Sequence, residues 1–428
     1  MPDEGLVTSA GLEAILANAR PRVIAALVRH FNSVDLAEDA FQDACEKAVR
    51  TWTDDGVARD PTAWLIVVAR RSAIDGIRKS RRRVGLLEAA ASVDEQPDPE
   101  EELLLQLDQD ELRDDVLRLM FMCCQPDLPL HDQLALALKV IAGFPVDNIA
   151  RAFVVQPKAM EQRITRAKKK AASVATRLET PTLQERARRL NAVSLMIYLL
   201  FNEGYTASGG DTHIREELCE EAIRLARLLL MLFPAQAEVM GLLALCLLQH
   251  SRRRARIGED GKLIALEDQD RGKWEQSAIS EGRALLEKAL RHGRPGAYQV
   301  QAAIAAVHCA APASDETDWR EIEQLYAALE QLQPSPVVSL NRAVAMSKAF
   351  SAEAALRHLG SVADSLSNYI YYHTTLASLL AETEQFDAAA AAYERALQLG
   401  PTEQQAGHIR ERMRFCEKRR IKSAPSVG

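Results

Sequence analysis

The chain has 428 residues, a formal net charge of −7, 5% aromatic residues and seven cysteines. This length predicts two or three domains, and the scarcity of aromatic residues beside abundant Ala, Leu, Arg and Glu favours an all-α fold. The negative charge excludes binding to nucleic acid through the field of the whole protein, so any such binding depends on local basic patches.

The cysteines do not have the spacing of a metal site. No two of them form a Cys-x-x-Cys pair, and the adjacent Cys123 and Cys124 cannot both ligate one tetrahedral metal without strain. Their odd number and scatter predict buried free thiols in a reducing compartment. Residues 1–9 lack the basic region of a secretory signal, and no apolar run approaches the length of a membrane span. We therefore expect a cytoplasmic protein with no cofactor, no metal and no membrane contact.

Residues 11–34 have the apolar spacing of one or two helices. A second helix is predicted from Asp35, with Glu38 as its capping-box partner three residues later. Its inward face is Leu36, Ala40, Phe41, Ala44 and Ala48, and its other face is an acidic stripe formed by Asp39, Gln42, Asp43 and Glu46. Such a stripe is most often a solvated surface, although its single sign also suits binding to a protein.

A third helix is predicted at residues 60–83, because Asp60-Pro61 is a strong start signal. It begins almost wholly apolar and ends almost wholly basic, in the sequence PTAWLIVVARRSAIDGIRKSRRR. Trp64, Val68, Arg71, Asp75 and Arg78 share one face, which suits stacking on an unpaired base and gripping phosphate. The alternative is a buried helix whose basic end is only solvated.

Residues 84–115 are polar, acidic and proline-bearing, and they predict a flexible linker that runs into a helix from about Glu100. Further helices are predicted over residues 116–143, with breaks near Pro126 and Pro129.

Residues 144–171 predict two short helices joined at residues 154–156. In the second helix one apolar stripe is formed by Met160, Ile164, Ala167 and Ala171. The opposite side presents long polar and cationic side chains, which can reach base edges in a major groove and neutralise phosphates. The alternative is an amphipathic surface helix that ends in lysines.

From residue 181 onward the pattern predicts an array of helical hairpins. The periodicity is clearest near the end, where the tetratricopeptide register is matched by Leu376, Ala377, Leu380, Phe386, Ala389, Tyr393, Ala396 and Pro401. Earlier repeats are weaker, and the final helix ends in a basic tail at residues 412–422. Two segments break the period: one around residues 202–205, predicted to interrupt a helix, and one at residues 250–274. Their charges either pair internally or form a site for a partner.

An enzyme is not indicated. His213 lies near Cys219 and His308 lies beside Cys309, but no carboxylate–histidine–nucleophile set and no glycine-rich phosphate loop is present. Buried, hydrogen-bonded histidines explain these positions better.

The order and spacing of these segments resemble the bacterial sigma-70 family over residues 12–178. Three sequences carry the resemblance, DLAEDAFQDACEKA, PTAWLIVVARRSAIDGIRKSRRR and PLHDQLALALKVIAGFPVDNIARAFVVQPKAMEQRITRAKKK. They are most similar to the extracytoplasmic-function branch, which keeps only the second and fourth conserved sigma regions. The whole layout resembles the members of that branch that carry a C-terminal tetratricopeptide-like extension.

The resemblance implies a sigma factor that directs core RNA polymerase to promoters and starts transcription. It implies four parts: a region 2-like domain at 10–83, an acidic linker at 84–112, a region 4-like helix-turn-helix domain at 113–178 and a tetratricopeptide-like array at 181–422. The implied partners are promoter DNA, the clamp helices of the largest polymerase subunit and the flap of the second-largest subunit. The array would tune activity or bind a protein partner.

The resemblance also implies three sets of site residues. Contact with the clamp helices would use Asp35, Glu38, Asp39, Gln42, Asp43 and Glu46. The minus-ten element would be melted and read by Trp64, Arg70, Arg71, Asp75, Arg78, Lys79, Arg81, Arg82 and Arg83. The minus-thirty-five element would be read by Lys158, Glu161, Gln162, Arg163, Thr165, Arg166, Lys168, Lys169 and Lys170.

Two positions depart from the family pattern. Arg71 stands where the family often has Asn, in the pocket for a flipped base, and Val154 replaces a glycine that is common in the turn between the last two helices. The alternative function is a helix-turn-helix transcription regulator fused to a tetratricopeptide-like scaffold. The acidic stripe and the 60–83 helix distinguish the two, because a plain regulator needs neither.

Overall fold

The structure, a computed structural model, describes residues 9–83, 109–125, 127–153, 155–175, 183–206, 212–258, 264–401 and 403–423. Within these ranges the chain is helical and contains no β-strand, which confirms the expected all-α fold. It divides into two compact units, Met1–Ala222 and Ile223–Gly428, and each unit is described by itself.

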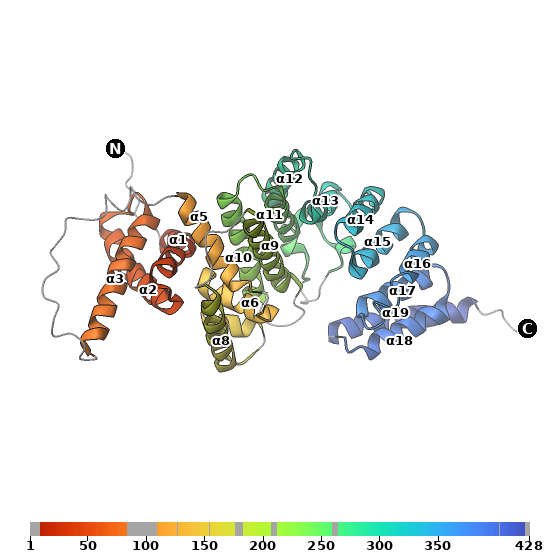
Figure 1. The fold of residues 1–428 in the computed structure, drawn as a ribbon. Helices are drawn as coiled ribbons and strands as arrows, with labels where there is room; N and C mark the ends of the chain where they lie inside the picture. Colours follow the sequence, from red (N-terminus) through yellow and green to blue (C-terminus); the bar gives the residue numbers. More distant parts are fainter. Residues whose placement is uncertain are drawn as a thin grey trace, which may run out of the picture. The chain divides into compact units, whose positions relative to one another are not determined.

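The first unit begins with three helices that pack on one another (Figure 1). They are α1 (Ser9–Phe31), α2 (Val34–Asp55) and α3 (Pro61–Arg83). Each contributes fully buried apolar side chains, such as Ile24, Ala44 and Leu65, so the predicted periodicity matches the observed core.

The start of α2 differs from the prediction. Ser33, not Asp35, is the N-cap, and its hydroxyl accepts a hydrogen bond from the Leu36 backbone N–H at 3.3 Å. Ser33 is an equally good cap two residues earlier, so Asp35 lies in the first turn, where its charge favours the helix dipole. Glu38 does not close a capping box, because its carboxylate bonds to Arg20 and Lys168.

The rest of the first unit is a second group of helices. It comprises α5 (Gln109–Cys123), α6 (Leu130–Ala137), the π-helix η1 (Leu138–Ala142), α7 (Val146–Ala152), α8 (Pro157–Ala175), α9 (Leu183–Thr206) and the first part of α10 (Thr212–Leu232). Of the expected linker at residues 84–112 and the helix expected from about Glu100, residues 84–108 lie outside the described residues, and the chain is helical from Gln109 in α5. α5 packs on α1, and α9 packs on α5 and α6. The compact unit therefore extends beyond residue 181, where the sequence places the start of the array.

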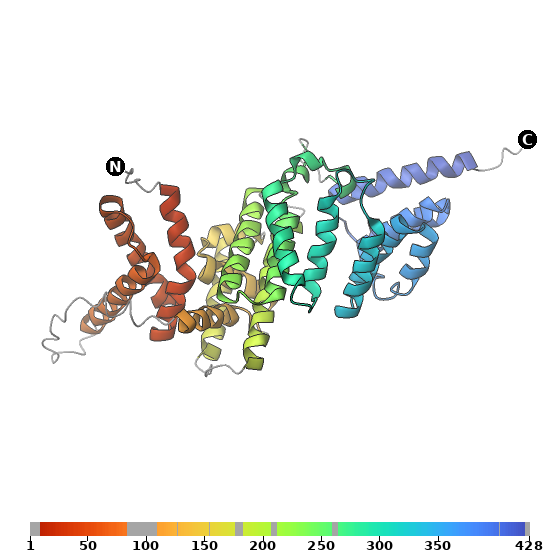
Figure 2. The ribbon, with the colours of Figure 1, turned by 90° about the horizontal axis from the view of Figure 1, so that it is seen from above.

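The second unit is a series of helices that pack on their neighbours in the chain (Figure 2). After the last part of α10 come α11 (Ala237–His250), η2 (Arg253–Ala255), η3 (Leu266–Asp268), η4 (Arg271–Lys273), α12 (Gln276–Leu290), α13 (Ala297–Ala310), α14 (Trp319–Leu332), α15 (Pro336–Ala349), α16 (Ala352–Gly360), α17 (Ile370–Glu382), α18 (Phe386–Gln398) and α19 (Glu403–Ser423). This arrangement agrees with the predicted hairpin array.

The core of the second unit forms where successive helices meet, as expected for a repeat array. The buried cluster between α17, α18 and α19 includes Ala377, Ala389, Tyr393 and Ala396, four of the positions that the register predicted. The prediction that residues 202–205 interrupt a helix is wrong, because α9 continues through Thr206. The apolar face of α9 runs through Leu200 and Phe201, which are fully buried, and this packing sustains the helix despite Gly204.

Candidate functional site

Helix α8 presents one buried face and one exposed face. Met160, Ile164, Ala167 and Ala171 are at most 4% exposed, as their spacing predicts. The exposed side chains of the predicted minus-thirty-five set are Lys158, Glu161, Gln162, Thr165, Arg166, Lys169 and Lys170. Helix α7 precedes α8 and buries Ile149 and Ala150. α8 therefore offers a long polar face on a packed support, as a groove-reading helix requires.

Contacts within the helical group fix the orientation of α8. Half-buried Arg163 pairs with Asp132 of α6, with 3.3 Å between Nε and Oδ1. Lys170 donates to the Asp127 carbonyl. Thr165 donates its hydroxyl to the Glu161 carbonyl at 2.9 Å. Arg163 and Lys170 of the predicted set are thus engaged in structural contacts.

The connection between α7 and α8 is short. The Val155 backbone N–H donates to the Ala150 carbonyl at 2.9 Å, and α8 begins two residues later at Pro157. Val154, which the sequence singled out at this turn, lies outside the described residues, as does Pro126 at the predicted break before α6.

Most of the predicted stripe on α2 is open to solvent. Asp39, Gln42, Asp43 and Glu46 are all exposed, and the three carboxylates among them are accessible along about two turns of helix. Asp43 accepts a hydrogen bond from the Ser72 hydroxyl of α3. Glu38 belongs to the predicted polymerase-binding set but not to the stripe, and its side chain is only 14% exposed.

Helix α3 begins at the predicted cap, where the Asp60 carboxylate accepts from the Ala63 backbone N–H at 3.0 Å. Trp64 is half-buried and packs against the buried Trp52, with ring centroids 5.1 Å apart. The two rings are tilted at 55° to each other, and this contact orients the Trp64 ring.

The charged end of α3 is exposed at Arg71, Asp75 and Arg78, while Arg70 is half-buried. Arg78 pairs weakly with Asp75 at 3.9 Å. The side chains of the other predicted residues, Lys79, Arg81, Arg82 and Arg83, lie outside the described residues.

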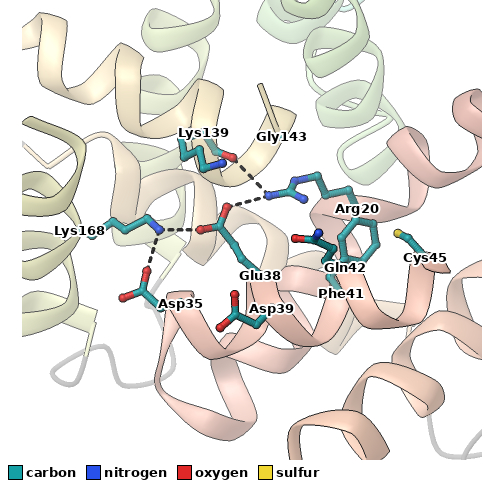
Figure 3. A pocket seen from close by; sticks show the side chains of 10 residues that line it. All are labelled: Arg20, Asp35, Glu38, Asp39, Phe41, Gln42, Cys45, Lys139, Gly143 and Lys168. Carbon is teal, nitrogen blue, oxygen red and sulfur yellow. Dashed lines mark hydrogen bonds and ion pairs between the residues drawn. The ribbon is translucent and has the colours of Figure 1, made fainter. Parts of the chain in front are cut away.

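A polar pocket of about 440 Å³ joins two of the predicted sets of residues (Figure 3). The Lys168 ammonium of α8 lies 2.7 Å from Asp35 Oδ1 and 2.6 Å from Glu38 Oε2. The other Glu38 oxygen accepts from Arg20 Nη2 of α1 at 2.8 Å. A residue of the predicted DNA-reading set is therefore bound to two residues of the predicted polymerase-binding set.

The charge of Lys168 is retained in this pocket. Partial burial by itself lowers the pKa of Lys168, but hydrogen bonds to Asp35 and Glu38 outweigh it, and the net shift is upward. The stability that this ion pair gives to the folded protein is fully present below the ordinary lysine pKa. It is lost only as pH rises through the raised pKa of Lys168. The ion pair is therefore complete at neutral pH.

Arg20 holds the second side of the pocket and was not singled out by the sequence. Its guanidinium donates to the Val140 and Lys139 carbonyls at 3.3 Å and lies 5.2 Å from the Phe41 ring centroid. The sequence gives no local signal for its role, because the carbonyls that it meets are more than a hundred residues away and Glu38 lies on the next helix. Beside it, burial raises the pKa of the Cys45 thiol to about 11 against the opposing effect of Arg20. Cys45 is thus protonated at neutral pH.

The cysteines agree with the prediction of buried free thiols at five positions, while Cys45 and Cys309 are partly exposed. All seven are free thiols, and Cys123, Cys124, Cys219, Cys246 and Cys416 are buried.

The insert at residues 250–274 makes mainly internal contacts, one of the two outcomes that the sequence left open. Arg253 pairs with Glu275, and Arg271 donates to the His308 and Ala311 carbonyls at 2.6 Å. The Arg271 guanidinium also lies 4.9 Å from the Trp274 ring centroid. These contacts fix the segment against α13.

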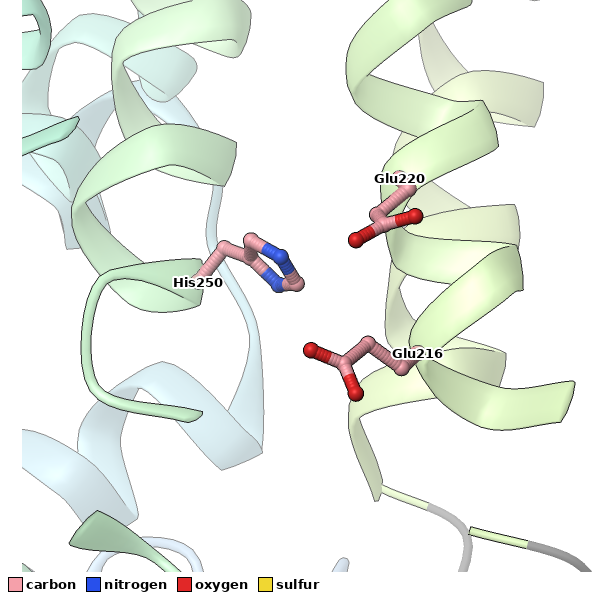
Figure 4. Close-up of side chains that lie close together, drawn as sticks. All are labelled: Glu216, Glu220 and His250. Carbon is pink, nitrogen blue, oxygen red and sulfur yellow. The ribbon is translucent and has the colours of Figure 1, made fainter. Parts of the chain in front are cut away.

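Further titratable side chains lie on α10 and α11 (Figure 4). Glu216 and Glu220 are one turn apart on α10, and His250 is the last residue of α11. Carboxylates one turn apart on an exposed helix are common, and no function is assigned to them.

None of the helices in the described ranges combines the length and apolar character of a membrane-spanning segment.

Comparisons with known proteins identify relatives of both halves of the chain. Residues 16–83 match the family Sigma-70 region 2, and residues 189–290 match a family of unknown function, DUF6596. The uncharacterized protein R00370 of Rhizobium meliloti (strain 1021) is 50% identical over 401 residues, which cover 93% of this chain and 94% of that protein.

Two solved structures share the helical character at low similarity. Yeast Tom70 aligns with 91% of this chain and 82% of its own, with 12% identity and a TM-score of 0.38. The tetratricopeptide domain of P58(IPK) aligns with 90% of this chain and 99% of its own, with 14% identity and a TM-score of 0.26. Likeness at this level says nothing about function.

Proposed function

The chain belongs to the sigma-70 family, and from this premise we propose that it is a sigma factor of the extracytoplasmic-function type that directs core RNA polymerase to specific promoters. The observation that carries the proposal is the match to sigma-70 region 2 over residues 16–83, which span most of α1 and all of α2 and α3. We propose that it acts in the cytoplasm, where its polymerase is, and that it catalyses no reaction of its own.

The exposed carboxylates of α2 support the polymerase contact. Asp39 and Glu46 lie two turns apart on one exposed face, so both can meet a basic surface at the same time. Charges of one sign along a helix accelerate encounter with a complementary surface and fix the register of docking. We propose that this face of α2 binds the clamp helices of the largest subunit.

Promoter recognition divides between α3 and α8. On α3 we propose that Trp64 and the arginines hold an unpaired strand of the minus-ten element, by stacking and by phosphate contact. On α8 we propose that Gln162 and Arg166 read base edges of the minus-thirty-five element, while Lys169 neutralises phosphates. α7 and α8 then act as a helix-turn-helix pair, with the flap of the second-largest subunit as the proposed support.

The second unit is proposed to bind a protein partner or to tune the activity of the first. Arrays of stacked hairpins present extended surfaces that suit protein contacts.

The polymerase contact is tested by reversing charges on α2. We expect Asp39→Lys with Glu46→Lys to abolish co-elution of the chain with core RNA polymerase, because both carboxylates would face a repelling surface. This pair is a sharper test than one that includes Asp43, whose bond to Ser72 also connects α2 to α3.

A matched control carries the same change of charge elsewhere. Glu382→Lys with Glu394→Lys reverses two exposed carboxylates in the second unit and should leave co-elution intact. Undiminished co-elution of the α2 variant would refute the assignment of this face, provided its helical circular dichroism matches that of the wild type.

A further inference from the structure

Two surfaces that the proposed function needs are bound to each other in this chain. Lys168, on the DNA-reading helix α8, donates to Asp35 and Glu38 at the start of the polymerase-binding helix α2. These residues are 130 or more positions apart in sequence, so the contact joins the α1–α3 group to the α6–α8 group (Figure 3). The inference drawn from this contact rests on the proposed function.

The contact is more than a pair of surface charges. The side chains of Lys168 and Glu38 are only 16% and 14% exposed, and Glu38 is shared between Lys168 and Arg20. Partly buried, networked charges are screened by salt much less than exposed pairs, and removing one partner leaves a buried charge behind. Breaking the contact is therefore costly unless another cation replaces Lys168.

A second contact closes the same junction from the side of α1. Arg20 donates to the carbonyls of Lys139 and Val140 in η1. Gly143, which follows η1, lies close to Arg20: it has φ +80°, and a Cβ there would lie 2.8 Å from Arg20 Nε. Lys168–Glu38–Arg20 thus forms a continuous chain from α8 through α2 to α1 and η1.

The two proposed functions compete for the same side chains at Lys168 and Glu38. While Lys168 bonds to Asp35 and Glu38, its ammonium cannot contact a phosphate of DNA. In the same state both oxygens of Glu38 are engaged, by Lys168 and Arg20, and its side chain is only 14% exposed, whereas Asp35 is 79% exposed and is bonded through one oxygen. Asp39, Gln42 and Glu46 stay exposed on the same helix and offer an initial docking surface.

We propose that the Lys168–Asp35–Glu38 contact is a latch that holds the free factor closed, and that a basic surface of core polymerase opens it by competing for the two carboxylates. Polymerase docks first on the exposed part of α2 and then displaces Lys168, which frees α8 to meet DNA. Binding linkage requires the converse, so DNA bound to α8 raises the affinity of α2 for polymerase.

The latch is tested by a distance measured in the full-length chain without polymerase or DNA. Spin labels carried by unnatural amino acids at Thr51 on α2 and Ala159 on α8, both exposed, avoid the native cysteines. Lys168→Glu places a third carboxylate beside Asp35 and Glu38, and the open-to-closed ratio should rise roughly tenfold or more. Lys169→Glu makes the same change one residue away, outside the latch, and should leave the distance unchanged.

A charge exchange separates the latch from a general loss of structure. Asp35→Lys with Glu38→Gln should also open the chain, because Lys168 then faces another lysine. Adding Lys168→Glu to that variant should close it again, since Glu at 168 can pair with Lys at 35 while Gln at 38 still accepts from Arg20. Recovery of the short distance requires a folded protein with a specific pair.

A DNA-binding measurement connects the latch to function. A non-specific DNA duplex should bind Asp35→Lys/Glu38→Gln several-fold more tightly than Asp39→Lys/Glu46→Gln, which changes the net charge equally but leaves the latch intact.

Adding core polymerase to the doubly labelled wild type should lengthen the distance between the spin labels on α2 and α8.

Three results would each overturn the latch. They are a spin-label distance that does not change in Lys168→Glu, no return of the short distance in the triple variant, or equal DNA affinity of the two charge-matched variants. A distance unchanged by bound polymerase would overturn its release by competition. Since the distances in the free chain need no polymerase, failure of the latch is distinguishable from failure of the sigma-factor assignment.

Discussion

The role of Glu38 in the structure differs from the roles that its position in the helix predicts. The sequence predicts it as a capping-box partner and the family resemblance as a polymerase-binding residue, but the structure uses both of its oxygens in ion pairs with Arg20 and Lys168. Helix propensity and spacing correctly place the residue on the polar side of α2. They carry no information on which distant cations meet it, because that depends on how the helices pack.

His308 provides a test of stability at the scale of one residue. Burial, together with the charges of Arg252 and Arg271, lowers the pKa of His308 from 6.5 to about 4. Between these values the unfolded chain binds this proton and the folded chain does not, so stability falls as pH drops from about 6.5 toward 4. The full pKa shift of His308 corresponds to a loss of about 3 kcal/mol in the free energy of unfolding.

Amide hydrogen exchange in α13 (Ala297–Ala310) measures this effect. We expect the opening free energy of the wild type to fall more between pH 7 and pH 5 than that of His308→Gln, which does not titrate. Carboxylates titrate equally in both proteins and cancel in the comparison. An identical pH dependence in the two proteins would show that His308 is not the titrating group.

At the scale of elements, α8 is the helix that the sequence describes best. The spacing of Met160, Ile164, Ala167 and Ala171 fixes its buried face, because periodicity of apolar residues depends only on helix geometry and burial. The same pattern cannot distinguish Lys168 from Lys169. Lys168 is held by Asp35 and Glu38 and Lys169 is exposed, and only the position of α8 near the start of α2 separates them.

The exposed face of α8 supports a prediction that separates base reading from phosphate contact. Gln162→Ala should relax sequence preference at one base pair, by about 1–3 kcal/mol, because an amide can bond to a base edge. Lys169→Ala should weaken binding to all duplexes alike and reduce the magnitude of the salt slope by about 1.

Binding selections on random duplexes at two or more salt concentrations measure both effects. Unchanged preference at every position in Gln162→Ala, with altered preference in Lys169→Ala, would mean that the opposite edge of α8 faces the groove.

At the scale of the whole molecule, the sequence predicts the fold class and the series of hairpins, and the compact units of the structure divide within a helix. The division falls after Ala222, within α10, because α9 packs on α5 and α6. Arg189 of α9, 1% exposed, lies with its guanidinium 5.3 Å from the Phe121 ring centroid of α5. A composition change near residue 181 marks a change of pattern, whereas packing decides which helices share a core.

Promoter-specific initiation by the purified full-length chain with core RNA polymerase is the most direct measurement of the proposed function. Templates with random upstream sequence are transcribed, and the 5′ ends of the products are sequenced. We expect start sites that core polymerase alone does not use, preceded by two shared sequence blocks at the minus-ten and minus-thirty-five positions, the second of which changes in Gln162→Ala. Start sites identical to those of core polymerase alone would contradict the assignment as a sigma factor.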